Sequence, residues 1–296
     1  MGLLDGRVAI VTGGGRALGR EHCLELARHG AVVDPGVGLG GETTEENPAE
    51  AMAREIRELG GTATAELDSV TDWAAAAGIV ERTVARFGRL DAVVNSAGIL
   101  RDRMITSMVE EDFDAVVGVH LKGTFVMTKH ACDHWRARAK AGEQVSGRII
   151  NTTSGAGMHG NAGQSAYAAA KAGVVALTLT TAIEMARYNV TCNAISPVAR
   201  TRMTARLALD RPAHEGAAVD PLHPRAAAPV VAYLASEASA WLSGQVLRIE
   251  GSTVIRMRGW QPSDVRYAAA DGGYLRADEL VTGLRTAYGT LPAGVG

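Results

Sequence analysis

RVAIVTGGGRALG, residues 7–19, decides the fold of this chain. The β-branched apolar run at residues 7–12 predicts a short strand, and a helix is predicted from residue 16 to residue 29. Between them, Gly13 suits a turn that needs unusual backbone angles, and Gly19 lets the helix pack closely on the strand. The free N–H groups at the start of such a helix can bind a pyrophosphate, so the stretch predicts a dinucleotide site. The alternative is a generic strand-to-helix turn.

Predicted strands and helices alternate from residue 7 to about residue 250. After the first strand, further strands are predicted at residues 31–33, 63–67, 90–95, 148–153, 190–196 and 245–250. Helices are predicted between them at residues 48–59, 71–87, 110–140, 166–188 and 226–234. This pattern predicts an α/β fold of the Rossmann type, a doubly wound parallel sheet of seven strands with helices on both faces.

The composition fits one large domain with a C-terminal extension. The chain has 296 residues, of which 47% are hydrophobic, and its formal net charge is −2. We predict a catalytic domain at residues 1–250 and an arm or tail at residues 251–296, with a helix at residues 277–288. The charge balance gives no reason to expect nucleic acid or a membrane as a partner. We find no signal peptide and no apolar run of the ~18 residues that span a bilayer.

The three cysteines, Cys23, Cys132 and Cys192, are far apart and show no metal-ligand spacing. An odd number of cysteines in apolar segments is typical of buried, reduced thiols. We therefore expect a cytoplasmic protein with no metal site.

Tyr167, Lys171 and Ser154 form a candidate catalytic set. Tyr167 and Lys171 are four residues apart on a predicted helix and therefore share a face. An ammonium group beside a phenol lowers the pKa of the phenol, which makes Tyr167 a usable acid or base. Ser154 follows the fifth predicted strand, and its hydroxyl can donate to a substrate oxygen. Such Tyr/Lys pairs alone are common, but with Ser154 and the phosphate turn they predict a hydride-transferring oxidoreductase.

With these residues in place, the chain resembles the short-chain dehydrogenase/reductase family over residues 5 to about 250. Three segments, residues 95–103, 119–125 and 199–203, resemble more closely a subgroup of hydroxyacyl-CoA and hydroxysteroid dehydrogenases. The resemblance implies hydride transfer between a nicotinamide cofactor and a secondary alcohol or ketone, with a 3-hydroxyacyl-CoA or a hydroxysteroid as substrate.

The resemblance also implies a role for each matching residue. Tyr167 is the acid/base, Lys171 lowers its pKa and holds the nicotinamide ribose, and Ser154 orients the substrate oxygen. The other matching residues are implied to contact the cofactor: Gly13, Arg16, Leu18 and Gly19 in the turn, Asp68 at the adenine, Asn95, Ala97 and Gly98 along the adenosine and ribose, and Pro197 and Thr201 at the nicotinamide amide.

Two positions depart from the family pattern. His120 stands where the family usually has an asparagine of a proton relay, and it is either a relay residue or a helix histidine satisfied by backbone or water. Ala17 stands where the pattern usually has a glycine, and its methyl group narrows the approach to the phosphate.

Two residues bear on the choice of cofactor. An acid at the end of the second strand favours NAD, and Asp34 is the candidate, although the strand looks short and Asp34 then falls in the following loop. Arg16 in the turn can pair with a 2′-phosphate and favours NADP. We expect NAD, with NADP as the alternative.

The remaining expectations concern partners and other functions. The helix at residues 166–186 is apolar nearly all round, which predicts a covering subunit in a homodimer or homotetramer. Arginines at positions 200, 202, 206 and 211 suit the phosphates of an acyl-CoA or simply a solvated loop. The alternatives are an NADPH-dependent 3-oxoacyl-ACP reductase and a non-catalytic dinucleotide-binding protein.

Overall fold

The computed structural model describes residues 2–28, 30–35, 47–200, 220–259, 267–268 and 275–288, with residues 30–35 and part of 275–288 as backbone only. The chain forms two compact units, Met1–Met257 and Arg258–Gly296. The first unit therefore includes seven residues that the sequence had assigned to the C-terminal extension, residues 251–257. In the second unit, the helix predicted at residues 277–288 is confirmed as α9 (Ala277–Tyr288).

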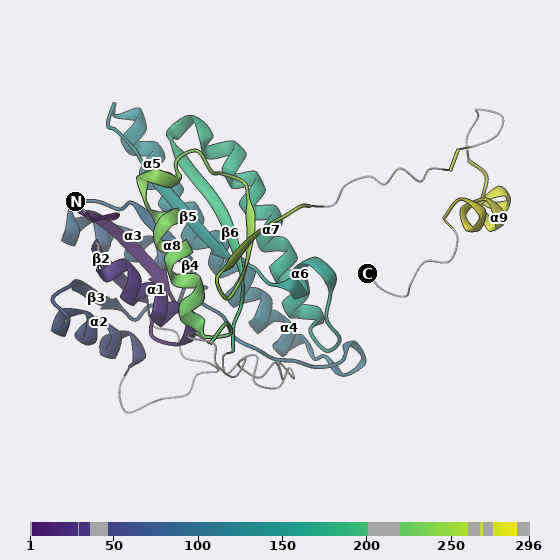
Figure 1. Cartoon of the computed structure of the whole chain (residues 1–296), viewed down its shortest axis with the longest axis horizontal. Helices are drawn as coiled ribbons and strands as arrows, with labels where there is room; N and C mark the ends of the chain where they lie inside the picture. Colours follow the sequence, from purple (N-terminus) through teal and green to yellow (C-terminus); the bar gives the residue numbers. More distant parts are fainter. Residues whose placement is uncertain are drawn as a thin grey trace. The chain divides into compact units, whose positions relative to one another are not determined.

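The first unit is built on one sheet of eight strands in the order β3-β2-β1-β4-β5-β6-β7-β8 (Figure 1). The strands are β1 (Arg7–Thr12), β2 (Gly30–Pro35), β3 (Thr62–Glu66), β4 (Ala92–Asn95), β5 (Gly147–Thr152), β6 (Val190–Val198), β7 (Val246–Glu250) and β8 (Thr253–Met257). All neighbouring pairs are parallel except β7 and β8. The Rossmann-type class is confirmed, and the strand order reverses between β1 and β4, where such sheets bind ligands.

The predicted count of seven strands is wrong because β8 was missed. A tight turn at Gly251, with φ +55°, folds Thr253–Met257 back onto β7 as an antiparallel edge strand. Its sequence, Thr-Val-Ile-Arg-Met, is β-branched like that of the other strands, but its first four residues are exposed. Only the pairing with β7 separates this segment from the C-terminal extension.

Strand β2 is also longer than its sequence suggests. It runs to Pro35 and pairs along its length with β3, with Asp34 opposite Ala65. Asp34 therefore lies in the strand, and the prediction that it begins a loop is wrong. Backbone hydrogen bonding to β3 extends β2 through Asp34, and the local sequence does not predict this pairing.

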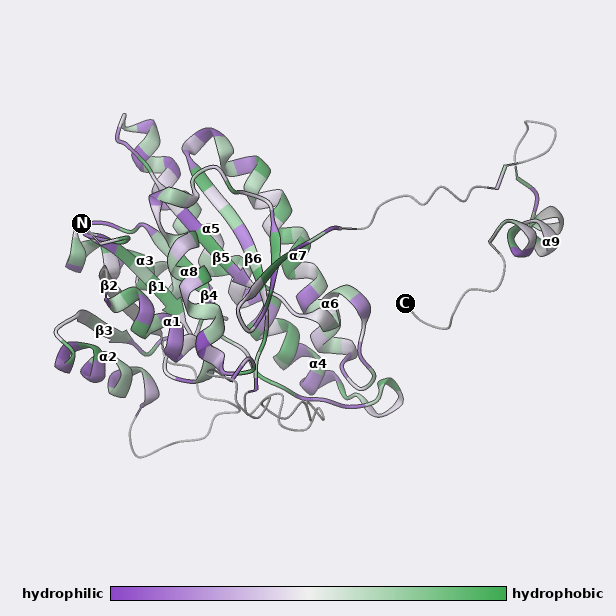
Figure 2. Ribbon diagram, viewed as in Figure 1, coloured by the Kyte–Doolittle hydropathy of each residue, from purple (hydrophilic) through white to green (hydrophobic). Residues whose placement is uncertain are grey.

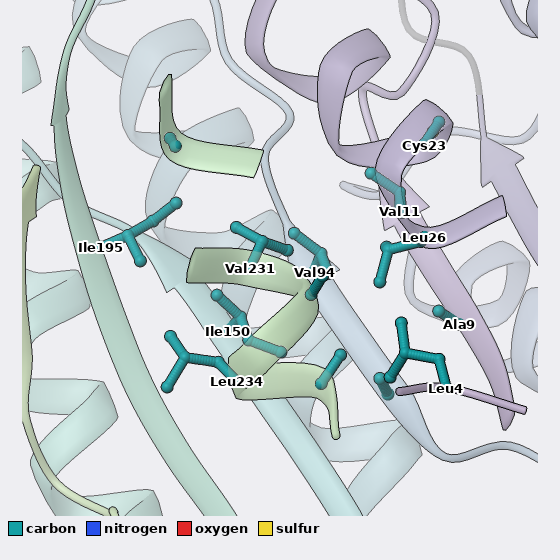
Figure 3. Close-up of a cluster of buried hydrophobic side chains, with 14 of the residues drawn as sticks. Leu4, Ala9, Val11, Cys23, Leu26, Val94, Ile150, Ile195, Val231 and Leu234 are labelled. Carbon is teal, nitrogen blue, oxygen red and sulfur yellow. The ribbon is translucent and has the colours of Figure 1, made fainter. Parts of the chain in front are cut away.

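Helices cover both faces of the sheet. One face packs on α1 (Ala17–Ala27) and α8 (Ala228–Ala235), with Leu26, Val231 and Leu234 against strand residues such as Val94 and Ile150 (Figure 3). The helices on the other face are α3 (Trp73–Phe87), α5 (Gly123–Lys140) and α7 (Ser165–Met185), and α2 (Pro48–Glu58) packs beside β3. Two buried cores on opposite faces fix the sheet between its helices.

The predicted helix at residues 110–140 is divided in the structure. It consists of α4 (Glu110–Val117), a π-helical segment (Gly118–Lys122) and α5. Such π-helical turns are rare and frequently occur at functional sites. His120 lies in this segment and is buried.

Residues Ser165–Tyr188, which include α7, form one helical stretch long and apolar enough to cross a membrane, with a mean hydropathy of 1.4. The expectation that no run reaches this length and composition is therefore wrong. Helix α7 packs on β5 and β6 and buries Lys171, as a sheet-covering helix does (Figure 2).

Candidate active site

The glycine-rich turn after β1 has the geometry of an anion cradle. Gly13 has a φ of +68°, and a Cβ atom there would lie 2.8 Å from the Cα of Ala97. A Cβ on Gly19 would lie 2.2 Å from the carbonyl oxygen of Gly13. Both positions therefore require glycine, because any side chain would push the turn away from α1 or from the end of β4.

The N-terminus of α1 has no side-chain cap. Arg16 is the N-cap residue and makes no capping hydrogen bond, whereas Asn47 and Asp72 cap α2 and α3. The first N–H groups of α1 thus remain available to a phosphate group and carry the positive end of the helix dipole. This uncapped end and the glycine cradle fit the pyrophosphate of a dinucleotide, so the predicted residues suit such a cofactor.

Other predicted turn residues differ in what they offer. The side chain of Leu18 packs against the buried core, so only its backbone can contact a ligand in the turn. The Arg16 guanidinium has a buried Nη1 atom without a hydrogen-bond partner. Ala17 has a φ of +46°, the left-handed region, which explains why this position favours glycine.

Thr12 joins the turn to the loop after β4, a role that the sequence analysis missed. Its Oγ1 accepts hydrogen bonds from the backbone N–H groups of Ser96 and Ala97, both at 3.0 Å. The residue is visible in the motif, but its partners are remote in sequence, so only the fold reveals the contact. This contact holds Ala97 and Gly98 beside the phosphate turn, as the cofactor prediction requires.

The Asn95 side chain is turned into the protein. Its Nδ2 donates to Asn151 Oδ1 at 2.9 Å and to Thr128 Oγ1 at 3.2 Å, while its Oδ1 has no hydrogen-bond partner. Asn151 in turn donates to Thr178 Oγ1 at 2.9 Å. The network ties β4, β5, α5 and α7 together, and any contact of the Asn95 side chain with a cofactor would have to use Oδ1.

Of four other predicted cofactor residues, the structure describes the side chains of two. Asp68 lies in the loop after β3 and pairs with Arg82 at 2.7 Å. Pro197 lies near the C-terminal end of β6, opposite Ile249 of β7. Thr201 and the Asp34 side chain lie outside the part of the chain that the structure describes.

Ser154, Tyr167 and Lys171 meet at the C-terminal end of β5. Ser154 is the N-cap of α6 (Gly155–His159), and its Oγ accepts from Ala156 N at 3.3 Å. Tyr167 shares a hydrogen bond with Ser154, and the Lys171 ammonium lies 5.7 Å from the Tyr167 ring centroid. The predicted grouping of these three side chains is therefore what the structure shows.

Backbone contacts hold Lys171 in place. Its Nζ donates to the carbonyl oxygen of Thr152 at 2.6 Å, and Thr153 Oγ1 donates to the Lys171 carbonyl oxygen at 2.8 Å. The side chain is 4% exposed, and burial lowers the pKa of Lys171 from 10.5 to about 7. An ammonium with such a pKa releases and regains its proton near neutral pH.

The pKa of Tyr167 departs from the sequence expectation. Burial raises this pKa, the hydrogen bond with Ser154 lowers it by less, and the charge of Asp102 raises it further. The net shift is therefore upward, opposite to the predicted direction, because desolvation of the phenolate dominates. Gln164 holds Asp102 with a hydrogen bond of 3.0 Å.

His120 packs directly against Tyr167. The two rings meet edge to face with centroids 5.0 Å apart, and His120 Nε2 lies 2.7 Å from the Ile99 carbonyl oxygen. Burial and, to a smaller extent, the charge of Lys171 lower the pKa of His120 to about 3, so the ring is neutral at physiological pH. A Cβ on Gly98 would lie 2.5 Å from this ring, so glycine makes room for histidine. The structure supports a backbone-held His120, and a relay role stays a prediction.

The part of the chain that the structure describes holds neither a disulfide nor a metal site. Cys23 and Cys192 are buried, and Cys132 is partly buried. Among the described residues, no group of three or more His, Cys, Asp or Glu side chains is arranged to hold a metal ion.

Comparisons with known proteins agree with this geometry. A profile of the short chain dehydrogenases matches residues 7–212. Hydroxyacyl-CoA dehydrogenase ChsB1 of Mycobacterium tuberculosis is 41% identical over 287 residues, covering 95% of this chain and 88% of that protein. Peroxisomal multifunctional enzyme type 2 of Drosophila melanogaster is 44% identical over 236 residues, covering 79% of this chain and 37% of that longer protein. The crystal structure of a short chain dehydrogenase from Mycobacterium avium matches with a TM-score of 0.87 and 43% identity, over 99% of this chain and 98% of that chain.

Proposed function

The chain belongs to the short-chain dehydrogenase family, and on that basis we propose that it transfers a hydride between NAD and the secondary alcohol of a 3-hydroxyacyl-CoA or a hydroxysteroid. The family assignment makes it an NAD(P)-dependent oxidoreductase. The observation that carries the proposal is the grouping of Ser154, Tyr167 and Lys171 at the same edge of the sheet as the uncapped helix and its glycine cradle. The hydroxyacyl-CoA substrate is supported by the name and the high coverage of the Mycobacterium tuberculosis relative.

The side chains divide the work of proton transfer. When bound, the nicotinamide supplies or accepts the hydride. In the oxidation direction Tyr167 Oη accepts the proton of the substrate hydroxyl, while Ser154 Oγ donates a hydrogen bond to the same oxygen. Lys171 is held by the Thr152 carbonyl oxygen. While its amine is protonated, Lys171 stabilises the phenolate of Tyr167. In reduction the proton moves back from Tyr167 to the substrate oxygen.

The Tyr167→Phe variant tests the proposal. It keeps the ring that packs on His120 and loses the oxygen that moves the proton, so we expect kcat to fall about 1,000-fold. Cofactor affinity should stay within about twofold of wild type, because the turn at Gly13 is untouched. The readouts are nicotinamide absorbance with 3-hydroxyacyl-CoA and steroid substrates and a cofactor titration. Tyr188→Phe, at a half-buried tyrosine packed on the core after α7, is the matched control. A Tyr167→Phe enzyme with full rate would overturn the assignment.

The proposal favours NAD because Asp34 lies in β2 next to the cradle strand β1. One observation favours the second candidate function, an NADPH-dependent 3-oxoacyl-ACP reductase: Arg16 has a buried Nη1 atom without a partner. Titrating both cofactors against wild type, Asp34→Ala and Arg16→Ala separates the two. NAD specificity requires Asp34→Ala to weaken NADH binding, whereas loss of NADPH binding in Arg16→Ala alone supports the reductase. Cofactor binding without turnover of any alcohol or ketone would instead support a non-catalytic dinucleotide-binding protein.

We further propose a homodimer or homotetramer that covers the outer face of α7. Ile183 is 78% exposed and Leu179 is 41% exposed on this helix, and Phe125 is exposed on the neighbouring α5. Exposed apolar side chains on packed neighbouring helices are typical of a subunit interface. Light scattering on wild type and Ile183→Glu tests this, with dissociation expected for the variant. A monomeric wild-type protein would contradict it.

A further inference from the structure

A cavity of about 590 Å³ lies at the N-terminal edge of the sheet. Its walls are residues that precede β4 and β5, including Asp91 and Ser146, together with Glu237 after α8. The catalytic side chains lie at the C-terminal ends of the strands, so this cavity belongs to neither the proton-transfer site nor the phosphate turn.

Arg148, the second residue of β5, lines this cavity and is 1% exposed. Its Nε donates to the Ser236 carbonyl oxygen at 2.9 Å and its Nη1 to the Gly147 carbonyl oxygen at 2.8 Å. Its Nη2 is buried and has no hydrogen-bond partner. A buried guanidinium with an unused N–H₂ group is costly unless an acceptor is supplied.

Arg7, the first residue of β1, brings a second buried guanidinium to the same edge. It is 6% exposed, donates to the Ser146 carbonyl oxygen at 2.7 Å, and has no partner for its Nε. Burial lowers the pKa of Arg148 to about 10, and the positive charge of Arg7 is the second cause of this shift. The two guanidinium groups therefore disfavour each other's charge, which the carboxylates of Asp91 and Glu237 partly offset.

Neither nearby acid pairs with Arg148. Asp91 is occupied by a two-pronged pair with Arg89, at 2.7 Å for both contacts, and also accepts from Val8 N. Glu237 forms an ion pair with Arg7 at 3.4 Å, and its side chain is 75% exposed. Arg138, also at the cavity, is paired with Glu143 at 2.6 Å. The hydrogen bonds of Arg148 go to two carbonyl oxygens and to no carboxylate.

We propose that this cavity binds a phosphate-type oxyanion held by the guanidinium group of Arg148. Arginine presents N–H groups in a planar fork that matches a tetrahedral oxyanion, and a buried site strengthens such charge-assisted bonds. Arg7 does not line the cavity, but it contacts two residues that do, Ser146 and Glu237, and its positive charge adds to that of Arg148. The cavity volume leaves room for a phosphate monoester as well as for inorganic phosphate.

Calorimetric titration of the full-length protein with inorganic phosphate, and separately with glycerol 3-phosphate, tests the proposal. The protein is first saturated with its nicotinamide dinucleotide so that the turn at Gly13 is filled, and sodium chloride at matched ionic strength is the reference. We expect saturable binding of one anion per chain. Tighter binding of glycerol 3-phosphate than of phosphate identifies a phosphate monoester as the ligand, and the reverse order identifies free phosphate.

Two variants place the binding at this cavity. Arg148→Lys keeps the charge but loses the fork, so we expect at least about tenfold weaker binding. Glu237→Gln removes the competing carboxylate from the surface and should bind about threefold tighter. Arg82→Lys on α3, which is paired with Glu66 and Asp68, is the matched control. If Arg148→Lys fails to fold, the affinity of the Glu237→Gln variant tests the proposal instead, because Glu237 is exposed. Absence of saturable binding to wild type, or unchanged affinity in Glu237→Gln, overturns the proposal.

Discussion

The two edges of the sheet bury cations of different chemistry. At the C-terminal edge Lys171 is 4% exposed and has a pKa lowered to about 7, while at the N-terminal edge Arg148 is 1% exposed and has a pKa lowered to about 10. Burial is the largest cause in both cases. A buried lysine titrates near neutral pH, whereas a buried guanidinium keeps its charge. The comparison shows why a buried lysine suits the proposed proton-transfer site, whereas a buried arginine keeps the opposite edge positive at every physiological pH.

The largest effect is expected on cofactor affinity, at Gly19, where the turn leaves no space for a side chain. In Gly19→Ala the new Cβ would lie 2.2 Å from the Gly13 carbonyl oxygen, so the turn must shift away from α1. We expect cofactor affinity to fall about 100-fold, as a displacement near 1 Å at a binding site does. Fluorescence titration with NADH and NADPH measures the change. Gly259→Ala, with no atom within 4 Å of its Cβ, is the control, and an affinity within threefold of wild type would contradict the cradle assignment.

The next effect is a pH dependence of the free energy of unfolding, which we expect from Lys171 at the C-terminal edge and not from Arg148 at the N-terminal edge. The pKa of Lys171 is about 7 in the folded protein and near 10.5 when unfolded, so the unfolded chain binds more protons between these values. The free energy of unfolding should therefore rise with pH in that window, by about 1 kcal/mol per pH unit. Lys171→Met should flatten this slope in urea unfolding at pH 7.5, 8.5 and 9.5, while exposed Lys140→Met should keep it. An unchanged slope in Lys171→Met would show that the lysine is not desolvated.

At the N-terminal edge, Arg148→Met should lower the free energy of unfolding by the same amount at each pH and should leave its pH dependence unchanged. Arg148→Met removes the hydrogen bonds that the guanidinium donates to the carbonyl oxygens of Ser236 and Gly147. We expect the free energy of unfolding to fall by about 2 kcal/mol at every pH from 7 to 9, since two buried hydrogen bonds from a charged donor are lost. The same urea series measures it. A variant that instead flattens the slope would erase the distinction between the two edges.

The smallest effect concerns the strained residue of the cradle. Ala17 has a φ of +46°, and glycine adopts this conformation without the clash of a Cβ. Ala17→Gly should stabilise the protein by about 0.5 kcal/mol, because relief of strain exceeds the entropy that glycine loses on folding. Thermal unfolding measures the gain. Ala51→Gly inside α2 should lose about 1 kcal/mol, and a similar loss in Ala17→Gly would contradict the strain.

Local patterns predicted most of the first unit. The β-branched runs and the apolar helices reproduce β1, β4, β5 and β6 and their connecting helices, because burial on both sheet faces selects such residues. The spacing of Tyr167 and Lys171 placed them on one helical face, which α7 confirms. Strand β8 and the end of β2 were missed, since their pairing partners and not their composition define them.

The site was predicted less completely than the fold. Residues of the phosphate turn and the Ser154 set were found from short motifs that precede or follow a strand. Thr12, Asp102 and Gln164 were missed as supporting residues because their contacts join segments remote in sequence. The π-helical segment around His120 was read as regular helix, since no residue pattern marks its wider turn.

The amino-acid sequence by itself determined the class of sheet, the glycine-rich turn and the candidate proton-transfer groups, because these depend on residue types at fixed short spacings. The tertiary structure decided the electrostatics: the raised pKa of Tyr167, the lowered pKa of Lys171, and the effect of the Arg7 charge on the pKa of Arg148. Desolvation and charge pairing depend on which distant segments exclude water from a side chain, and only the folded chain brings those segments together.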